Sequence, residues 1–265
     1  MSYQALILRD AARAAATVRE FEQLGIESCC ARLIDTVWPA DRSELSRGVA
    51  ALAAGSYQWL VLTSVNTVEV IATLLAGRPL PPRLRVAAVG TKTAKAARAQ
   101  LGVDADFVPT EQSAAGMVAQ WQLEPGQKIF YPHGDLASST LSAGLGAHEV
   151  HEVLAYRTVA AGSGGAPLTA VPAPPGIRVL APEEITRQLD RLDLLVFSAP
   201  SIVRRFVQLA GDRLPERVKT VAIGQPTAAA LRAAGLRVDA IAAEPTPAGL
   251  ARAAQELLHN ANHQF

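Results

Sequence analysis

The sequence predicts an α/β protein of two similar lobes, each a doubly wound, flavodoxin-like parallel sheet with helices on both faces. Two observations support this fold class. Short, continuously apolar runs alternate with helical stretches along most of the 265 residues, and one part of the chain repeats another. Fully apolar strands that alternate with helices of about 10–15 residues are typical of βαβ units and a buried parallel sheet.

The repeat can be read directly from the letters. AVGTKTAKAARAQLGVDADFVPTEQSAAGM, residues 88–117, resembles AIGQPTAAALRAAGLRVDAIAAEPTPAGL, residues 222–250. Gly90 aligns with Gly224 in this comparison. Such a pair of segments indicates that one α/β module occurs twice.

Apolar runs predict the strands, and the Ala-, Leu- and charge-rich stretches between them predict the helices. A glycine directly after the last helical residue marks the expected end of several of these helices. In the first part of the chain the expected elements are, in order, strand 5–8, helix 11–24, strand 28–34, strand 59–62, helix 65–75, strand 85–89, helix 92–101, a short strand ending at Phe107, helix 113–121, strand 128–131, helix 136–145 and strand 150–155. In the second part they are strand 194–197, helix 201–209, strand 218–223, helix 226–234, strand 238–241 and helix 247–258.

The order of these modules predicts which residues share a lobe. The opening βαβ unit, residues 5–34, resembles residues 128–155, but the segments that should pack with the opening unit come only after Gly176. We therefore expect a first lobe of residues 1–35 plus 165–265 and a second lobe of residues 40–157, with residues 36–39 and 158–164 as hinge or linker. The chain would cross twice between the lobes and form a two-stranded hinge beside a ligand cleft.

Composition argues against several classes of function. The 25 basic and 24 acidic residues give a net charge of +1 and form no basic stripe, which argues against a general nucleic-acid binder. No apolar run approaches the length of a membrane span and no signal peptide is visible, so we expect a cytoplasmic protein. The two cysteines, Cys29 and Cys30, are adjacent and are expected to be buried thiols in a strand.

Small polar residues follow four of the expected strands, in two pairs that the repeat relates. They are Ser64 and Asn66, Ser198 and Ser201, Gly90, Thr91 and Thr93, and Gly224, Pro226 and Thr227. A helix that begins at such a loop offers unpaired N–H groups and the positive end of its dipole, which together bind anions. The simpler alternative is that these residues only begin their helices. Four related loops favour a ligand with several anionic groups.

Few titratable residues stand at the same ends of the strands. Arg9 ends the first strand, His133 follows strand 128–131, and Tyr156 lies at the second crossing between the lobes. Each could be a surface or packing residue, although a phenol that faces a ligand can donate a proton. Glycine-rich phosphate loops, the nucleophile elbow and the H-E-x-x-H zinc motif are absent from the sequence. No metal or cofactor site is expected.

Nine short motifs resemble those of the uroporphyrinogen-III synthase family, in the family's order and over nearly the whole chain. They are ALILRD (5–10), RLIDTV (32–37), VLTSVN (61–66), AVGTKTA (88–94), YPHGD (131–135), AYRTV (155–159), VFSAPS (196–201), AIGQPTAAAL (222–231) and PTPAGL (245–250). The sequence departs from the family pattern at Asp10, where Pro is common, at His133, where Arg is common, and at Ala199, where Ser is usual.

The resemblance implies a cofactor-independent, cyclising carbon–oxygen lyase. Its substrate would be hydroxymethylbilane, an open-chain tetrapyrrole with many carboxylates. The substrate would lose water and close through a spiro intermediate, with ring D inverted, to give uroporphyrinogen III. Tyr156 would be the general acid, and Arg9, His133, Gly134 and the residues of the four loops would bind substrate.

The family also implies a monomer, with porphobilinogen deaminase as a transient supplier of substrate and with no membrane or nucleic-acid partner. One alternative stays open at this point. A non-catalytic, two-lobe protein that binds or senses a small polyanionic metabolite would need the same duplicated fold and the same loops.

Overall fold

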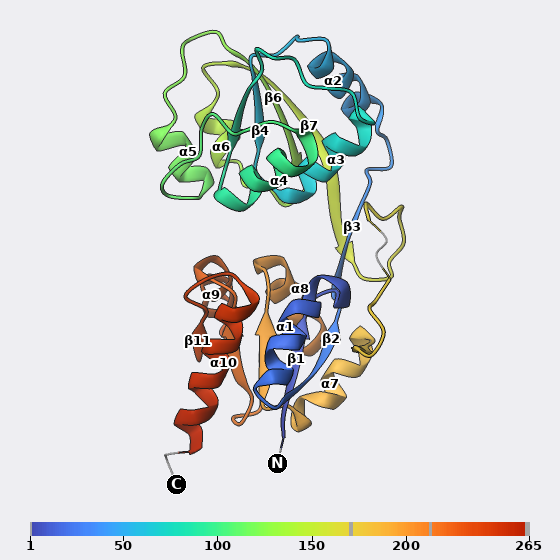
Figure 1. The fold of residues 1–265 in the computed structure, drawn as a ribbon, viewed down its shortest axis with the longest axis vertical. Coiled ribbons are helices and arrows are strands. Elements are labelled where there is room, and N and C mark those ends of the chain that lie inside the picture. Colours follow the sequence, from blue (N-terminus) through green and yellow to red (C-terminus); the bar gives the residue numbers. More distant parts are fainter. Residues whose placement is uncertain (1, 170–171, 212–213, 263–265) are drawn as a thin grey trace. The chain divides into compact units, whose positions relative to one another are not determined.

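The computed structural model describes residues 2–169, 172–211 and 214–262, with the side chains of residues 260–262 excepted. The chain forms two compact units. Unit 1 comprises Met1–Asp35, Ala160–Ser163 and Ala170–Phe265, and unit 2 comprises Thr36–Val159 and Gly164–Thr169. Each unit has helices on both faces of a sheet (Figure 1), and the α/β fold class expected from the sequence is confirmed.

Unit 1 is built on a six-stranded sheet in which every pair of neighbours is parallel. Its strands are β1 (Tyr3–Leu8), β2 (Ile26–Ala31), β8 (Arg178–Leu180), β9 (Leu194–Phe197), β10 (Lys219–Ala222) and β11 (Ala240–Ile241), in the order β11-β10-β9-β1-β2-β8. All four residues of β9 are buried, because helices cover both faces of the sheet.

Two helices cover one face of this sheet and three cover the other. On the first face lie α1 (Ala11–Gln23) and α10 (Pro247–Asn262), and on the second lie α7 (Ile185–Gln188), flanked by the short 3₁₀ turns η1 (Pro182–Glu184) and η2 (Leu189–Arg191), α8 (Pro200–Ala210) and α9 (Gln225–Ala233). Asp10 begins α1, and its carboxylate accepts from the N–H groups of Ala12 and Arg13 at 3.1 and 3.3 Å. The residue that departs from the family pattern is therefore a helix cap.

Unit 2 contains most of a five-stranded sheet. Its strands are β3 (Ile34–Val37), β4 (Trp59–Leu62), β5 (Arg85–Ala88), β6 (Lys128–Gly134) and β7 (Glu149–Ala160), in the order β3-β7-β6-β4-β5. The four strands β7, β6, β4 and β5 pair in parallel. One face is covered by α2 (Ser43–Ala53), α3 (Val65–Leu75) and α4 (Thr91–Leu101), and the other by α5 (Ala114–Gln120) and α6 (Thr140–Gly144).

The two sheets have the same strand order once the order along the chain is permuted. Strands β8-β2-β1-β9-β10 of unit 1 correspond to β3-β7-β6-β4-β5 of unit 2. Phe107 forms one parallel bridge with Ala87 of β5, at the place that β11 takes in unit 1. In unit 2 these segments follow one another along the chain, whereas in unit 1 the β1-α1-β2 segment comes from the chain's start. The repeat in the sequence is therefore a repeat of structure.

The corresponding helices α5 and α10 have equivalent hydrogen bonds at their first turns. The hydroxyl oxygen of Ser113 accepts from the Gly116 N–H at 2.9 Å, and that of Thr246 accepts from the Gly249 N–H at 3.1 Å. A Cβ atom on either glycine would lie within 2.2 Å of a backbone carbonyl oxygen. The close approach explains why both copies keep glycine at this position.

Several element boundaries differ from those expected. The expected strand 28–34 is broken at Arg32 and Leu33, and β3 begins after the break. The helix expected over 136–145 shrinks to α6, and the short strand near Phe107 is a single bridge. The elements α2, β8 and α7 lie in segments to which the apolar pattern assigns nothing. Elements of three or four residues, such as β8 and α7, are too short for a period to be visible.

Residues 164–169 pair with β3 of unit 2. Val37 and Pro167 form an antiparallel bridge, and the Leu168 N–H donates to the Thr36 carbonyl at 3.0 Å. The Leu168 side chain packs against the core of unit 2. The segment thus belongs to unit 2, whereas the expected lobe boundary placed most of it in the first lobe.

The adjacent cysteines provide a test of the unit 1 core. Cys29 and Cys30 are buried free thiols. Burial raises the pKa of both, and that of Cys30 reaches about 12, with the neighbouring Cys29 as a smaller cause. Neither thiol should react with a disulfide reagent at pH 8 while the chain is folded, and both should react once denaturant unfolds it.

The same pKa shifts predict how stability depends on pH. The thiols ionise less readily in the folded state than in the unfolded state. Their full contribution to the free energy of unfolding is therefore present below the unfolded pKa of about 8.5. The free energy of unfolding should then fall as the pH rises toward the folded pKa values. Denaturant titrations at several alkaline pH values measure this slope, and rapid labelling of one thiol per native chain would contradict the buried assignment.

Candidate functional site

Ligands of open parallel sheets bind beyond the carboxyl ends of the strands, where the chain order reverses. In unit 1 this point lies between β1 and β9, and in unit 2 it lies between β6 and β4. Most of the predicted site residues follow these strands or their neighbours β10 and β5. His133 and Gly134 are the last two residues of β6, and Tyr156 lies in β7 opposite the end of β6.

An irregularity of one residue places the Tyr156 side chain beside Gly134. His133 pairs with Leu154, but the next residue, Gly134, pairs with Tyr156, so Ala155 is an extra residue in β7. Such a bulge redirects the side chains that follow it. A Cβ atom on Gly134 would lie 2.5 Å from Cζ of the Tyr156 ring and 2.8 Å from its hydroxyl oxygen. The ring can occupy this place only because residue 134 has no side chain.

The side chains of Ser64 and Asn66 act on the Tyr156 phenol. Burial raises the pKa of the phenol above its ordinary value, the contacts with Ser64 and Asn66 lower it, and the charge of Asp135 raises it. Since the net direction is upward, the phenol keeps its proton at neutral pH. It can therefore donate that proton to a departing oxygen.

Ser64 and Asn66 owe their positions to the start of α3. Ser64 is the cap residue, and its hydroxyl oxygen accepts from the Asn66 N–H at 3.1 Å. This bond satisfies one of the N–H groups that the first turn of a helix leaves unpaired. The cap residue Ser64 and the second helical residue Asn66 are thus the two whose side chains act on the phenol.

Thr63 and Tyr131 complete this group; they lie in the motifs VLTSVN and YPHGD but were not among the predicted site residues. Tyr131, in β6, is 2% exposed, and the Thr63 side chain acts on its phenol. Burial raises the pKa of Tyr131, the contact with Thr63 opposes this, and the charges of Glu152 and Tyr156 add to the rise. We call Thr63, Ser64, Asn66, Tyr131 and Tyr156 the phenol cluster.

His133 lies at the end of β6, outside the phenol cluster. Its Nδ1 lies 3.0 Å from the carbonyl oxygen of Gly134, and its Nε2 lies 3.5 Å from Oε2 of Glu152 in β7. Its ring packs on that of Tyr131, with the ring centroids 4.8 Å apart. His133 therefore links β6 to β7, and a contact with substrate stays a prediction.

The start of α4 is partly occupied by the chain itself. The Oε1 atom of Gln112 accepts from the Thr91 N–H at 3.0 Å and from the Thr91 hydroxyl at 3.3 Å. Gly90 leaves room for this amide, since a Cβ atom there would lie 2.6 Å from Oε1. Thr93, in the same turn, is 6% exposed. An amide oxygen thus stands where the sequence predicts an anionic ligand.

In unit 1, Arg9 follows β1 and is half-buried. Burial lowers the pKa of its guanidinium, the neighbouring charge of Arg13 lowers it further, and Asp10 opposes both. Arginine stays protonated despite such a shift, so positive charge stands at the end of β1. Ser198, at the end of β9, donates to the carbonyl oxygen of Leu8 at 2.8 Å and joins the two central strands.

A proline limits what the start of α8 can offer to a ligand. Pro200 is the first residue of α8 and has no N–H. The Ile202 N–H donates to the Ala199 carbonyl at 3.1 Å. Of the first three residues of the helix, only Ser201 therefore has an N–H group left for a ligand.

A proline also limits the N–H groups that the start of α9 can offer to a ligand. Pro226 is its second residue, and the Thr227 N–H donates to the Gly224 carbonyl at 3.1 Å. This leaves the Gln225 N–H for a ligand. Gly224 has extended backbone, and a Cβ atom there would come no closer than 4.0 Å to Pro226. The Thr227 side chain is 2% exposed.

The structure brings together Tyr156, Gly134, Ser64 and Asn66, which the sequence names in separate motifs. Thr63, Tyr131 and Gln112 belong to the same ends of the strands but were not among the site residues predicted from the sequence. For Gln112 the repeat offers a signal. Gln112 aligns with Pro245, and a proline cannot make the hydrogen bonds of a glutamine side chain, so the two copies differ in chemistry at this position. For Tyr131 the motif YPHGD was a signal, but a buried aromatic residue in a strand is usually part of the core.

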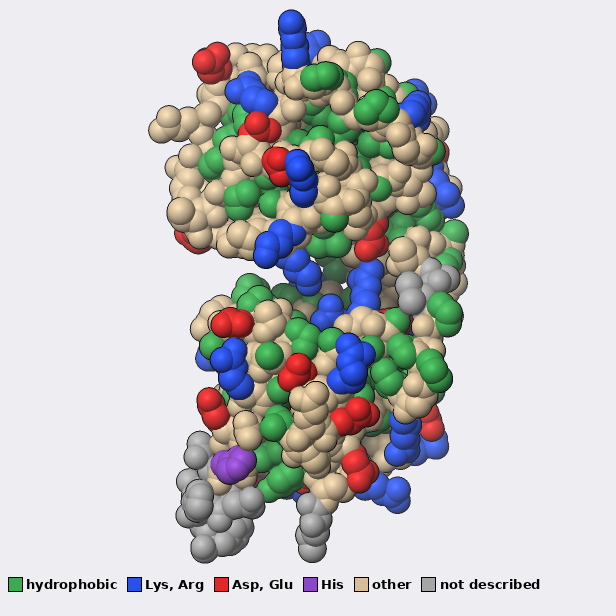
Figure 2. All heavy atoms as spheres, viewed as in Figure 1, with side chains coloured by type: hydrophobic (Ala, Val, Ile, Leu, Met, Phe, Trp, Pro, Cys, Tyr) green, Lys and Arg blue, Asp and Glu red, His purple; other side chains and the backbone are tan. Residues whose placement is uncertain are grey.

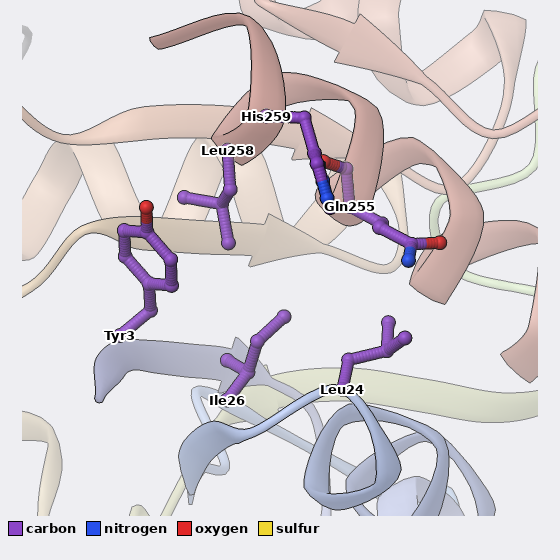
Figure 3. A pocket seen from close by; sticks show the side chains of 6 residues that line it. All are labelled: Tyr3, Leu24, Ile26, Gln255, Leu258 and His259. Atoms are coloured by element: carbon purple, nitrogen blue, oxygen red, sulfur yellow. The ribbon is translucent and has the colours of Figure 1, made fainter. Parts of the chain in front are cut away.

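A pocket of about 160 Å³ lies elsewhere in unit 1. Its lining side chains come from the β1-α1-β2 segment and from α10, and are Tyr3, Leu24, Ile26, Gln255, Leu258 and His259 (Figure 3). Tyr3 and Ile26 are the first residues of β1 and β2, so the pocket lies at the amino ends of the strands. It is separate from the loops described above.

In the part of the chain that the structure describes, no three His, Cys, Asp or Glu side chains are grouped as a metal site. Among those same residues, no helix combines the length and the apolar character that a membrane span requires. Figure 2 shows basic and acidic side chains interspersed on the drawn face of each unit.

The fold and the loops define a duplicated α/β protein with a polar site at the carboxyl ends of its strands. Residues 15–252 match the family model described as uroporphyrinogen-III synthase HemD. The chain belongs to this family, and the resemblance found in the motifs is confirmed.

Individual relatives agree with this assignment. The uroporphyrinogen-III synthase of Synechococcus elongatus is 29% identical over 189 residues, which cover 66% of this chain and 62% of that protein. Two crystal structures of uroporphyrinogen III synthase from Thermus thermophilus, a mutant and the wild type, match with TM-scores of 0.71 and 0.55. Each is 19% identical and covers 98% of this chain and 100% of its own. At that identity the likeness establishes the fold.

The fit between Gly134 and the Tyr156 ring can be measured as a coupling energy. Gly134→Ala should destabilise unit 2 by about 1–3 kcal/mol, because the new methyl group overlaps the ring. The loss should be much smaller in a Tyr156→Ala background, where the ring is gone. Denaturant unfolding of the wild type, the two single variants and the double variant measures the four free energies of unfolding from which the coupling energy is calculated.

Gly146→Ala is the matched control, since its Cβ would lie an ordinary 3.4 Å from the Ala143 carbonyl oxygen. It should cost little in either background. Equal losses for Gly134→Ala with and without the Tyr156 ring would show that the clash lies elsewhere.

Proposed function

We propose that this chain is a uroporphyrinogen-III synthase, a cofactor-independent, cyclising carbon–oxygen lyase that acts on hydroxymethylbilane. The observation that carries the proposal is the match of residues 15–252 to the family of that name. The phenol cluster supports it, because a phenol that stays protonated at neutral pH suits a reaction that begins with the loss of a hydroxyl group.

Tyr156 is proposed as the general acid. It donates a proton to the hydroxyl of the hydroxymethyl group on ring A, the C–O bond breaks, and water leaves an azafulvene cation. Ring D attacks this cation through its substituted carbon and forms the spiro intermediate. Fragmentation and reclosure then invert ring D, and the proton lost when the ring regains aromaticity restores the phenol.

Shape is the larger part of the proposed catalysis. The open substrate also closes unaided to the uninverted isomer I, so the protein's task is to favour the conformation that inverts ring D. Holding the reacting carbons together can lower a barrier by about 7–11 kcal/mol at most. No strong nucleophile is needed, in agreement with the neutral character of the phenol cluster.

The substrate carboxylates are proposed to bind Arg9 and the N–H groups of Ser201 and Gln225 in unit 1. Their proposed partners in unit 2 are Thr93 and His133. The substrate-binding residues named from the sequence all stay predictions, as does the binding of one substrate by loops of both units. A cytoplasmic monomer supplied by porphobilinogen deaminase is part of the same proposal.

The test couples the purified chain to porphobilinogen deaminase and porphobilinogen. The products are oxidised, and isomers I and III are separated by chromatography. Mostly isomer III, against isomer I in the reaction without the chain, is the expected result. Isomer I alone from a folded protein would overturn the proposal and favour the non-catalytic binding protein.

Tyr156→Phe tests the acid within that assay. It removes only the hydroxyl and should lower kcat by roughly a hundredfold, the lower range for a general acid. Tyr57→Phe is the matched control, because the Tyr57 hydroxyl bonds Nδ1 of His151 at 2.5 Å near the amino ends of the strands. A full rate for Tyr156→Phe would assign the acid role to water or to a substrate carboxylate.

A further inference from the structure

The His133 ring lies between two oxygen atoms that accept hydrogen bonds. Its Nδ1 is 3.0 Å from the carbonyl oxygen of Gly134, and its Nε2 is 3.5 Å from Oε2 of Glu152. A carbonyl and an ionised carboxylate have no hydrogen to donate, so each ring nitrogen meets its neighbour favourably only as an N–H. The imidazolium has an N–H at both nitrogens, whereas the neutral ring has only one. The surroundings of His133 therefore suit the charged ring.

The register of the strands and a bond from α6 place the Glu152 carboxylate. Glu152 pairs with Tyr131 across β7 and β6, and His133 lies two residues beyond Tyr131. Side chains two residues apart in a strand share a face, so all three lie on one face of the sheet. The Ser142 hydroxyl, in α6, donates to Oε2 of Glu152 at 2.9 Å. The oxygen that faces His133 is thus held by a second element.

Two other titratable groups lie close to this ion pair. The Tyr131 ring packs on the imidazole, with the ring centroids 4.8 Å apart. Burial raises the pKa of its phenol and the charge of Glu152 adds to the rise, so this phenol is neutral. Asp135 follows β6, and its Oδ1 accepts from the Thr158 N–H at 2.9 Å. Of the acidic side chains in the described part of the chain, Glu152 is the one that forms an ion pair with His133.

Positive charge at this place has a counterpart in unit 1. Strand β6 corresponds to β1, and Arg9 follows β1 directly. An arginine is charged in any surroundings, whereas the charge of a histidine depends on its neighbours. We propose that Glu152 is a positioning residue, which holds the His133 ring as an imidazolium at the carboxyl end of β6, where it pairs with a carboxylate of the substrate. The substrate part of this inference rests on the proposed function.

The ion pair can exchange one carboxylate for another. Its 3.5 Å separation is longer than a normal N–H···O hydrogen bond, and the His133 side chain is 22% exposed. When a substrate carboxylate takes the Nε2–H, Glu152 keeps its bond from Ser142. Neither the imidazolium nor the Glu152 carboxylate is then left without a partner, so the exchange avoids the cost of an unpaired charge.

The first test measures the protonation of His133 by NMR of the chain labelled with ¹⁵N in its histidine rings. The chain has five histidines, and the signals lost in His133→Gln assign this ring. At pH 7 both ring nitrogens of the wild type should give the shifts of protonated nitrogen. Glu152→Gln keeps the shape of the side chain and removes its charge. The protonated fraction of His133 should then fall by roughly threefold or more, because an opposite charge nearby favours the charged ring.

Glu149→Gln is the matched control. It makes the same change of charge in the same strand, but Glu149 is the first residue of β7 and pairs with Lys128 at 3.2 Å, at the amino ends of the strands. The His133 signals should stay as in the wild type. A neutral His133 ring in the wild type would overturn the proposal. So would an unchanged ring in Glu152→Gln, or an equal loss in both variants, which would reflect net charge alone.

The coupled assay tests the substrate part. At pH 7.5 Glu152→Gln should raise KM by roughly threefold to tenfold with little change in kcat, because a binding interaction is lost while the acid is intact. At pH 6 solvent protonates the ring, and KM should return toward the wild-type value at that pH. Adding His133→Arg to Glu152→Gln supplies a permanent charge and should also restore KM at pH 7.5.

A KM that does not rise in Glu152→Gln would overturn the substrate part. A raised KM that neither low pH nor His133→Arg restores would show a loss of shape instead of charge, and would overturn it too. If the wild-type chain forms no isomer III, the proposed function fails. The NMR comparison still decides whether Glu152 holds His133 as an imidazolium.

Discussion

The parallel pairing of β1 with β9 is the contact on which unit 1 depends, because it joins the chain's first strand to one that begins at Leu194. The Ser198 hydroxyl closes the same junction on Leu8, 190 residues away in sequence. Bringing such distant segments together costs conformational entropy, which burial of the sheet on both faces must offset. All of unit 2 lies within this loop of chain. The opening strand pairs early with β2, but it gains its second neighbour only once the second half of the chain is present.

Duplication supplied two copies of one fold, and the loops at the ends of the strands have since acquired different chemistry. Ser64 caps α3, whereas the corresponding Ala199 precedes a proline that begins α8. Gln112 occupies the start of α4, whereas Pro245 stands at its counterpart in the repeat. The core positions cannot diverge in this way, because packing constrains them, but loops at the ends of strands can. The phenol cluster is accordingly a property of unit 2.

The chemistry of the phenol cluster follows from burial and neutral hydrogen bonds. Desolvation raises the pKa of Tyr156, and the Ser64 and Asn66 side chains moderate that rise without adding charge. A cationic neighbour would lower the pKa further and make the phenol a stronger acid, but it would also attract the carboxylates of a polyanionic substrate to the wrong place. In unit 1 the positive charge of Arg9 stands at the end of β1.

Continuous apolar runs and the internal repeat were enough to predict two parallel α/β sheets, because a strand buried on both faces needs apolar residues at every position. The caps at Ser113 and Thr246 depend on local hydrogen bonds, each to an N–H group three residues further along the chain. The sequence did not predict the bulge at Ala155 or the packing of the Tyr156 ring on Gly134. It also did not predict the effect of Thr63 on Tyr131. They depend on the register between β6 and β7 and on which strands become neighbours, and both are settled by packing across the whole sheet rather than by any local pattern.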